Sequence, residues 1–357
     1  MMNEPSDTFA RSAEPHEAQE SPTVVEVERE GFSLGRSLRN PRTIISFVLA
    51  LAIILFIFRG LDINVAQTWS YIRKANGWLF LLGFLVFYAT FPIRAFRWRI
   101  LMKNAGIPVQ EGRHSWASMP ALLEYLYLSW FANCIVPAKL GDAYRGYLLK
   151  HNGGVSFSRT FGTIFTERLL DMIVLFALLV ISAWSVFGAS LPPNAKWVFA
   201  LGLVLVIIIV MGLAAMRFLS PFIRRVVPQR VEPMYASFEA GTLGALKPRS
   251  FPLLFVLTSL VWLGESLRLF LVIEAMGGLS MRLPSVIFVA LMGSLLTTIP
   301  ATPGGLGVVE GGVTGVLSAL FGIAAPVAAA VAVLDRVINY WSIVVGGLIV
   351  YVFSKRK

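Results

Sequence analysis

The stretch Pro303-Gly-Gly-Leu-Gly307 interrupts apolar sequence, and Pro137-Ala-Lys-Leu-Gly141 interrupts an earlier apolar region in the same Pro-x-x-Leu-Gly pattern. Both patterns are expected to break helices, because proline lacks an amide hydrogen and glycine lacks a side chain. On the next long apolar segment each is followed by an acid–arginine pair, Glu167-Arg168 in the first copy and Asp335-Arg336 in the second. Duplicated broken helices with duplicated intramembrane charges predict a transporter built from internal repeats.

The composition excludes several classes of protein. Of the 357 residues, 56% are hydrophobic and 14% are charged, whereas a soluble domain carries about 25% charged residues. The chain is therefore predicted to be an integral membrane protein. The net charge of +11 fits cytoplasmic loops beside anionic lipids, so we expect no nucleic-acid partner. Cys134 is the single cysteine and the three histidines are scattered, so we expect no metal site and no cofactor.

The chain is predicted to be an all-α polytopic membrane protein with about six to eight transmembrane helices. Residues 1–40 are expected to form a disordered cytoplasmic tail, and residues 41–357 a single transmembrane domain. The expected apolar segments are 43–58, 78–91, 116–136, 160–187, 197–216, 252–275, 283–299, 313–323 and 326–353.

Two of these segments adjoin the breaks and are expected to be re-entrant or half-helices. Segment 313–323 is shorter than the ~20 residues that a span requires. Three spans separate the two broken units, so the second unit is predicted to be inverted relative to the first. The repeat units would then cover about 116–187 and 283–353. The arginine-rich loop 217–251 places both termini in the cytoplasm, with the chain in the cell inner (plasma) membrane.

The charged groups inside the spans are the candidate site. A charge at the bilayer centre costs about 2.5–3.5 kcal/mol, so such groups face a protein interior or a watery cavity. Arg94, Arg97 and Arg99, by contrast, follow an apolar run and are expected to extend toward cytoplasmic headgroups. The predicted substrate-binding residues are Asn133, Arg145, Glu167, Arg168, Asp171, Gly304, Gly305, Gly307, Glu310, Asp335 and Arg336; the predicted helix-breaking residues are Pro137, Gly141, Pro300 and Pro303.

These stretches give the chain a resemblance to a known family. The motifs are Asn133-Cys-Ile-Val-Pro-Ala-Lys-Leu-Gly-Asp-Ala-Tyr-Arg145 with Glu167-Arg-Leu-Leu-Asp171, then Pro303-Gly-Gly-Leu-Gly-Val-Val-Glu310 with Asp335-Arg336. From residue 40 onward the sequence resembles the lysylphosphatidylglycerol synthase transmembrane, or flippase-like, family. In multiple-peptide-resistance proteins this region precedes an aminoacyltransferase domain. Only residues 354–357 follow the last predicted span here, so the resemblance implies lipid translocation without lysyl transfer.

The leading hypothesis is a lipid flippase or scramblase for a membrane phospholipid or a polyprenyl-phosphate-linked lipid. Arg145, Arg168 and Arg336 would contact the lipid phosphate. The carboxylates Glu167, Asp171, Glu310 and Asp335 would hold these arginines, or titrate if transport is coupled to protons.

Two alternatives stay open. The first is a membrane transferase that acts on a lipid or polyprenyl-phosphate headgroup and uses a buried acid as general base. The second is a non-catalytic scaffold for envelope enzymes, in which the buried charges are salt bridges that join helices. We expect no enzymatic activity, because the sequence contains no recognisable catalytic motif. The lipid, the energy source and homo-oligomerisation are left undetermined by the sequence.

Overall fold

The computed structural model describes residues 41–60, 63–109, 115–136, 140–188, 193–297 and 302–357, and within these ranges the regular structure is helical. The predicted all-helical membrane fold is therefore confirmed. Five helical segments of the described residues are long and apolar enough to cross a membrane: Gly77–Asn104, Phe157–Phe187, Phe251–Ala275, Pro303–Phe321 and Ala325–Phe353. A bent pair, Gly202–Phe218 with Ser220–Val226, makes up to six.

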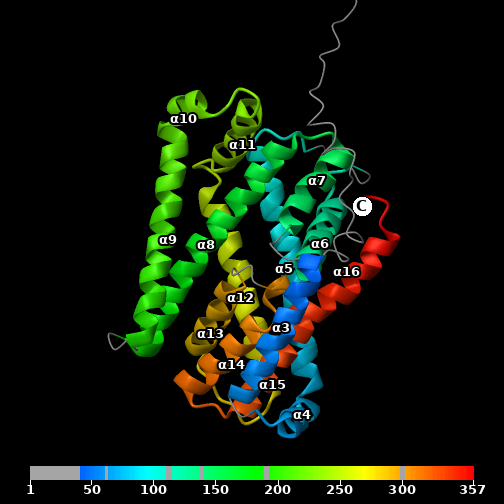
Figure 1. Cartoon of the computed structure of the whole chain (residues 1–357), viewed down its shortest axis with the longest axis vertical. Helices are drawn as coiled ribbons and strands as arrows, with labels where there is room; N and C mark the ends of the chain where they lie inside the picture. Colours follow the sequence, from blue (N-terminus) through cyan, green and yellow to red (C-terminus); the bar gives the residue numbers. More distant parts are fainter. Residues whose placement is uncertain (1–40, 61–62, 110–114, 137–139, 189–192, 298–301) are drawn as a thin grey trace, which may run out of the picture.

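The helices follow the chain in this order, with the labels of Figure 1: α3 (Pro41–Gly60), α4 (Val65–Lys74), α5 (Gly77–Asn104), α6 (Met119–Ile135), α7 (Gly141–Gly153), α8 (Phe157–Phe187), α9 (Pro193–Phe218), α10 (Ser220–Val226), α11 (Glu232–Ala245), α12 (Phe251–Ala275), α13 (Leu283–Leu296), the 3-10 turn η2 (Pro303–Gly305), α14 (Val308–Phe321), α15 (Ala325–Arg336), the π-helical turn η3 (Val337–Trp341) and α16 (Ser342–Phe353).

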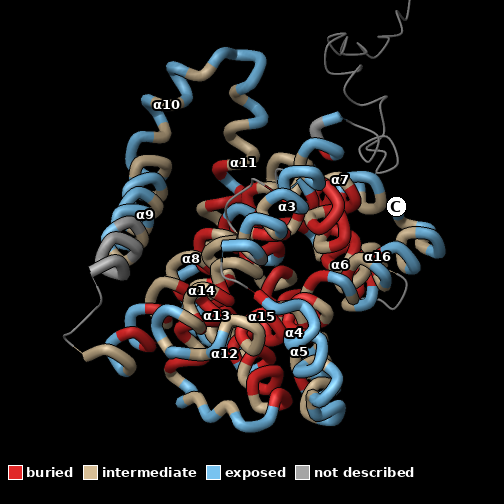
Figure 2. The backbone as a smooth tube through the Cα atoms, turned by 60° about the horizontal axis from the view of Figure 1, so that its bottom comes forward, coloured by how far each residue is buried: buried red, intermediate tan, exposed pale blue. Residues whose placement is uncertain are grey.

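Helices α5 and α12 pack along each other at the centre of the bundle. The α5 helix starts where the side chain of Asn76 accepts the backbone N–H of Trp78 at 2.9 Å, which satisfies one of the amides left free at a helix start. Its apolar face continues to Met102, well past the predicted end at Phe91. Figure 2 shows the buried backbone concentrated in this central region.

Each Pro-x-x-Leu-Gly stretch joins two helices that pack against each other. The first joins α6 to α7 and the second joins α13 to α14 through η2. In Figure 1, α6 and α7 lie in the half that holds the C-terminus, whereas α13 and α14 lie in the other half. The inverted relation of the two units stays a prediction. Pro137 and Pro300 lie outside the described residues; Gly141 is the first residue of α7, and Pro303 is the first of η2.

The predicted short arm at 313–323 was wrong in its boundary. Helix α14 begins at Val308, and with η2 it forms a 19-residue segment that is long enough to span a membrane. The sequence suggested a later start because Glu310 and two glycines follow the break. In the structure the charge of Glu310 is paired with Arg336, at 2.9 Å between Oε1 and Nε, so the helix includes it.

The predicted loop 217–251 contains two helices instead of irregular chain. Helix α9 bends by 83° into α10, and α11 packs back on α8. In Figure 2, α9 stands apart from the buried core, and much of it is exposed. Figure 1 places α10, α11 and the C-terminus at one end of the molecule and α4 at the other.

This arrangement predicts which segments share a side of the membrane. Single cysteines at Arg230 and Lys357, in a Cys134→Ala background, should react with an impermeant maleimide from the same side. A cysteine at Lys74, in α4, should react from the opposite side. Labelling of positions 74 and 230 from one side would contradict the arrangement.

Candidate functional site

Each break is called a cassette together with the helices that follow it, α7 and α8 in the first and α14 to α16 in the second. A cluster of three arginines and three carboxylates lies at the first cassette. Its members are Arg97, Arg145, Arg168, Asp142, Glu167 and Asp171, from α5, α7 and α8. Arg97 Nη1 lies 2.6 Å from Asp171 Oδ1, and Arg97 Nη2 lies 3.1 Å from Glu167 Oε1. Because the side chain of Arg97 is fully buried and those of both acids are 1% exposed, each charge depends on its partners for stabilisation.

The second cassette holds a cluster of the same composition. Its members are Arg94, Arg268, Arg336, Glu265, Glu310 and Asp335, from α5, α12, α14 and α15. Arg268 binds Asp335 through two contacts of 2.8 and 3.1 Å and also pairs with Glu265. Arg94 reaches the same Glu265 at 2.7 Å. Each cluster therefore contains equal numbers of positive and negative side chains.

The two cassettes share one contact at the same spacing. In each, an acid in the first turn of the helix after the break binds an arginine 26 residues later. Asp142 binds Arg168 at 2.9 and 3.2 Å in the first cassette, and Glu310 binds Arg336 at 2.9 Å in the second. These bonds attach the helix after each break to the next helix along the chain, α7 to α8 and α14 to α15.

Side chains also satisfy the backbone groups at the breaks. The Asn133 side chain accepts the N–H of Gly141 at 2.8 Å, and Glu310 Oε2 accepts the N–H of Gly307 at 2.7 Å. Arg336 donates to the Gly304 carbonyl at 2.7 Å. Unwound backbone is tolerated at membrane depth only where protein or water supplies such partners. The breaks are thus stabilised by the residues that the sequence singled out.

The second cassette contacts the end of α6 through Tyr340. The Tyr340 hydroxyl donates to the Cys134 carbonyl at 2.8 Å, just before the first break. The ring of Tyr340 packs so closely over Gly304, which has φ of 56°, that a side chain at that position would overlap it. Tyr340 belongs to the π-helical turn η3, directly after Asp335 and Arg336. Such turns are frequent at functional sites.

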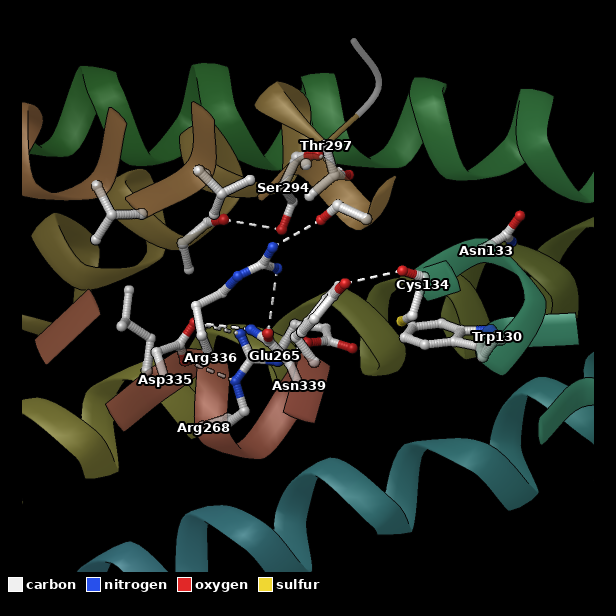
Figure 3. A pocket seen from close by; sticks show the side chains of 18 of the residues that line it. Trp130, Asn133, Cys134, Glu265, Arg268, Ser294, Thr297, Asp335, Arg336 and Asn339 are labelled. Carbon is white, nitrogen blue, oxygen red and sulfur yellow. Dashed lines mark hydrogen bonds and ion pairs between the residues drawn. The ribbon is translucent and has the colours of Figure 1, made fainter. Parts of the chain in front are cut away.

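A cavity of about 210 Å³ lies between the two cassettes. Four arginines and three carboxylates are among the residues that line it: Arg94, Arg168, Arg268, Arg336, Asp142, Glu265 and Asp335. Figure 3 shows Arg268, Glu265, Asp335 and Asn339 gathered on one side, with Trp130 and Cys134 of α6 on the other. Ser294 of α13 and Thr297, directly after that helix, lie along another wall. The described wall therefore carries one more positive than negative side chain.

Some of the predicted site residues line this cavity, and others lie behind its wall. Six of them line it: Asn133, Arg168, Gly304, Gly305, Asp335 and Arg336. Arg145 is fully buried, its guanidinium lies over the ring of Trp98 at 4.6 Å from the ring centre, and it pairs with Glu167, so its predicted phosphate contact stays a prediction. Glu167 and Asp171 lie behind the cavity wall with it. Gly307 caps α14, and Glu310 reaches a neighbouring cavity.

Arg94 and Arg97 belong to the two charged clusters, which the sequence pattern did not predict. They are 3% and 0% exposed, so the predicted extension toward headgroups is contradicted for both. The two residues are three positions apart, so they lie on the same side of the helix, and apolar residues continue beyond them. This pattern could have indicated that both side chains point into the bundle. Glu265, Arg268 and Asn339 also belong to the cavity wall, although none was among the predicted binding residues.

Comparison with known proteins identifies the family. The family model for the lysylphosphatidylglycerol synthase TM region matches residues 43–347. The chain belongs to this family. This member is similar to a UPF0104 membrane protein of Methanocaldococcus jannaschii, with 35% identity over 227 residues, 64% of this chain and 95% of the relative. A UPF0104 membrane protein of Pyrococcus horikoshii is 24% identical over 335 residues, covering 85% of this chain and 94% of the relative.

A further relative carries an enzyme name. The glycosyltransferase AglD of Haloferax volcanii is 23% identical over 340 residues. The match covers 84% of this lysylphosphatidylglycerol synthase TM family member but 52% of AglD. About half of AglD therefore lies outside the region that the two chains share.

The burial of the first cluster predicts a large cost for removing Arg97. Replacing it with alanine leaves two buried carboxylates short of a partner, so Arg97→Ala should lower the free energy of unfolding by about 3–5 kcal/mol. The measurement is reversible unfolding of the purified protein in micelles. The control is Arg224→Ala, which breaks the Arg224–Glu239 pair, whose arginine side chain is 44% exposed and whose loss should cost about 0–1 kcal/mol. Equal stability of the two variants would show that the Arg97 pairs contribute little.

Proposed function

We propose that this protein moves a phosphate-bearing lipid between the leaflets of the cell inner membrane. The observation that carries the proposal is the cavity between the two cassettes, whose described wall has one more arginine than carboxylate inside apolar helices. The guanidinium groups on that wall present N–H groups that the oxygens of an anionic phosphodiester would accept. Charged residues placed within spans are expensive, so they mark substrate pathways more often than inert packing.

Arg168 and Arg336 are the residues proposed to contact the phosphate. Both line the cavity, and each is oriented by an acid at the start of the helix after a break. Arg168 keeps 34% of its side chain exposed, which leaves donors for a ligand. The planar guanidinium presents paired N–H groups that match two phosphate oxygens. The headgroup would pass from one arginine to the other as the lipid changes leaflet.

The orientation of the protein belongs to the same proposal. The end with α10, α11 and the C-terminus carries Arg217, Arg224, Arg225, Arg230 and the final Lys-Arg-Lys. Basic residues of short loops remain in the cytoplasm. We therefore place this end, together with the N-terminus, on the cytoplasmic side.

The contacts of the acids favour translocation over a transferase reaction. Asp142, Glu265 and Asp335, the described carboxylates that line the cavity, each lie within 3 Å of an arginine nitrogen. Each of these carboxylates is thus already held by an arginine, whereas a general base must be placed to approach the substrate proton that it removes. The name of AglD is the reason to test transferase activity as well.

Reconstitution tests the proposal directly. Purified protein is placed in liposomes of phosphatidylglycerol that contain a trace of fluorescent phosphatidylglycerol, and an impermeant reductant destroys the fluorescence of the outer leaflet. Wild-type protein should raise the loss well above half of the signal. Arg168→Ala and Arg336→Ala should return the loss to about half, with and without an imposed proton gradient.

The matched control is Arg224→Ala, which removes an arginine and an ion pair outside the cavity and should behave as wild type. Half loss with wild-type protein, for phosphatidylglycerol and for a fluorescent polyprenyl phosphate, would contradict the proposal. Loss beyond half that is equal in all variants would contradict the assigned roles of Arg168 and Arg336. A headgroup product that depends on Asp335, without lipid movement, would favour the transferase.

A further inference from the structure

A second cavity of about 190 Å³ adjoins the Arg336–Glu310 pair, between α3, α14 and α15. Arg336 lines both this cavity and the polar one. Apart from Arg336, Glu310, Thr314 and Trp341, the described side chains that line it are aliphatic, among them Ile54, Ile57 and Ala332. A polar cavity and an apolar one thus meet at a single guanidinium.

The α15 wall of this apolar cavity is one helix face. Ala332 and Val333 lie three and four residues after Ala329, and Arg336 lies seven after it, so the four share one face of the helix. The alanines supply the space, because larger side chains there would fill it. Ala329 and Ala332 are each 3% exposed, so lipid around the protein does not reach them in this structure.

Helix α3 covers the outer side of the apolar cavity. Its outward side chains are strongly exposed, with Ile45 at 65% and Phe56 at 78%, as expected for a helix that faces lipid. It packs on η2 and α14, where Gly307 and Gly311 allow close approach: a side chain at Gly307 would lie 2.9 Å from Ile53, and one at Gly311 would overlap Ile57. Among the described side chains of α3, those of Thr43 and Ala50 are buried. The helix is therefore a peripheral cover.

We infer that the apolar cavity holds one hydrocarbon chain of the lipid whose phosphate contacts Arg336, and that this lipid enters beneath α3. The inference rests on the proposed function. A lipid joins an anionic phosphate to an apolar chain, and Arg336 lies where the cavities that match these parts meet. An apolar cavity of about 150 Å³ binds benzene, so the space accepts a segment of a chain. A free phosphate would leave the apolar cavity without an occupant.

Photolabelling tests the chain site without depending on transport. The protein is placed in nanodiscs of phosphatidylglycerol with a trace of phosphatidylglycerol that carries a diazirine midway along one acyl chain. After illumination, mass spectrometry should find label on α15 between Ala329 and Val333. Label on the outer face of α3, at Ile45 and Phe56, is the internal reference for surrounding lipid.

Two variants separate the chain site from surrounding lipid. Ala332→Phe fills the cavity and should remove the α15 label at least fivefold relative to the α3 label. Arg336→Ala should also lower it severalfold, since the headgroup loses its anchor. Label on α3 alone in the wild-type protein would overturn the inference. An α15 label that is unchanged in Ala332→Phe would overturn it as well.

A reversible crosslink tests entry beneath α3. The variant Ile57→Cys/Gly311→Cys, in a Cys134→Ala background, places two thiols where α3 and α14 touch, within the Cβ separation of about 3.5–4.5 Å that a disulfide needs. The smaller cysteine at 57 makes room for the one at 311. Oxidation should stop lipid movement and a reductant should restore it. The controls Ile57→Cys/Gly311→Ser and Ile57→Ser/Gly311→Cys carry one of the two thiols each and should stay active in both conditions.

The outcomes distinguish the two proposals. Movement that continues at the wild-type rate in the oxidised protein would overturn entry beneath α3 and leave translocation standing. An α15 label in a protein that moves no lipid would support the chain site and contradict the proposed function.

Discussion

The attachment of each helix break to a long transmembrane helix is the constraint on which the rest of the structure depends. Asp142 with Arg168, and Glu310 with Arg336, make this attachment at the same spacing in both cassettes. Without it, an acid, an arginine and unwound backbone would each face hydrocarbon, at a cost of several kcal/mol per group. With it, the breaks can lie inside the bundle, and the space between them becomes a polar cavity.

Charge balance explains why the centre of the bundle tolerates so many ionised groups. Each cluster has three arginines and three carboxylates, and aromatic rings cover several of the arginines. Helix α5 contributes to both clusters, since Arg97 pairs in the first and Arg94 in the second. The described cavity wall has one more arginine than carboxylate because Glu310, the partner of Arg336, lines the neighbouring cavity instead. In the proposed function, Arg168 and Arg336, which line the cavity, contact the phosphate, whereas Arg145, Glu167 and Asp171 stabilise the wall from behind.

The sequence predicted the membrane fold and the two cassettes because their signals are local. Proline and glycine at the breaks, and acid–arginine pairs within apolar helices, can be recognised without knowing any partner. The failures involve partners distant in the chain. Arg94 and Arg97 pair with residues 171 and 74 positions away, so their place at the end of an apolar run suggested headgroups instead. The start of α14 was misplaced for the same reason, since Arg336 compensates Glu310. The burial of Arg145 depends on Trp98, which no local pattern connects to it.

A lipid phosphate in the cavity between the two breaks would be visible in a cryo-electron microscopy map of the protein in phosphatidylglycerol nanodiscs. We expect headgroup density in contact with Arg168 or Arg336, with a hydrocarbon chain leading from Arg336 toward Ala329. A map in which water alone fills the cavity, and headgroups appear only at the two membrane surfaces, would contradict it.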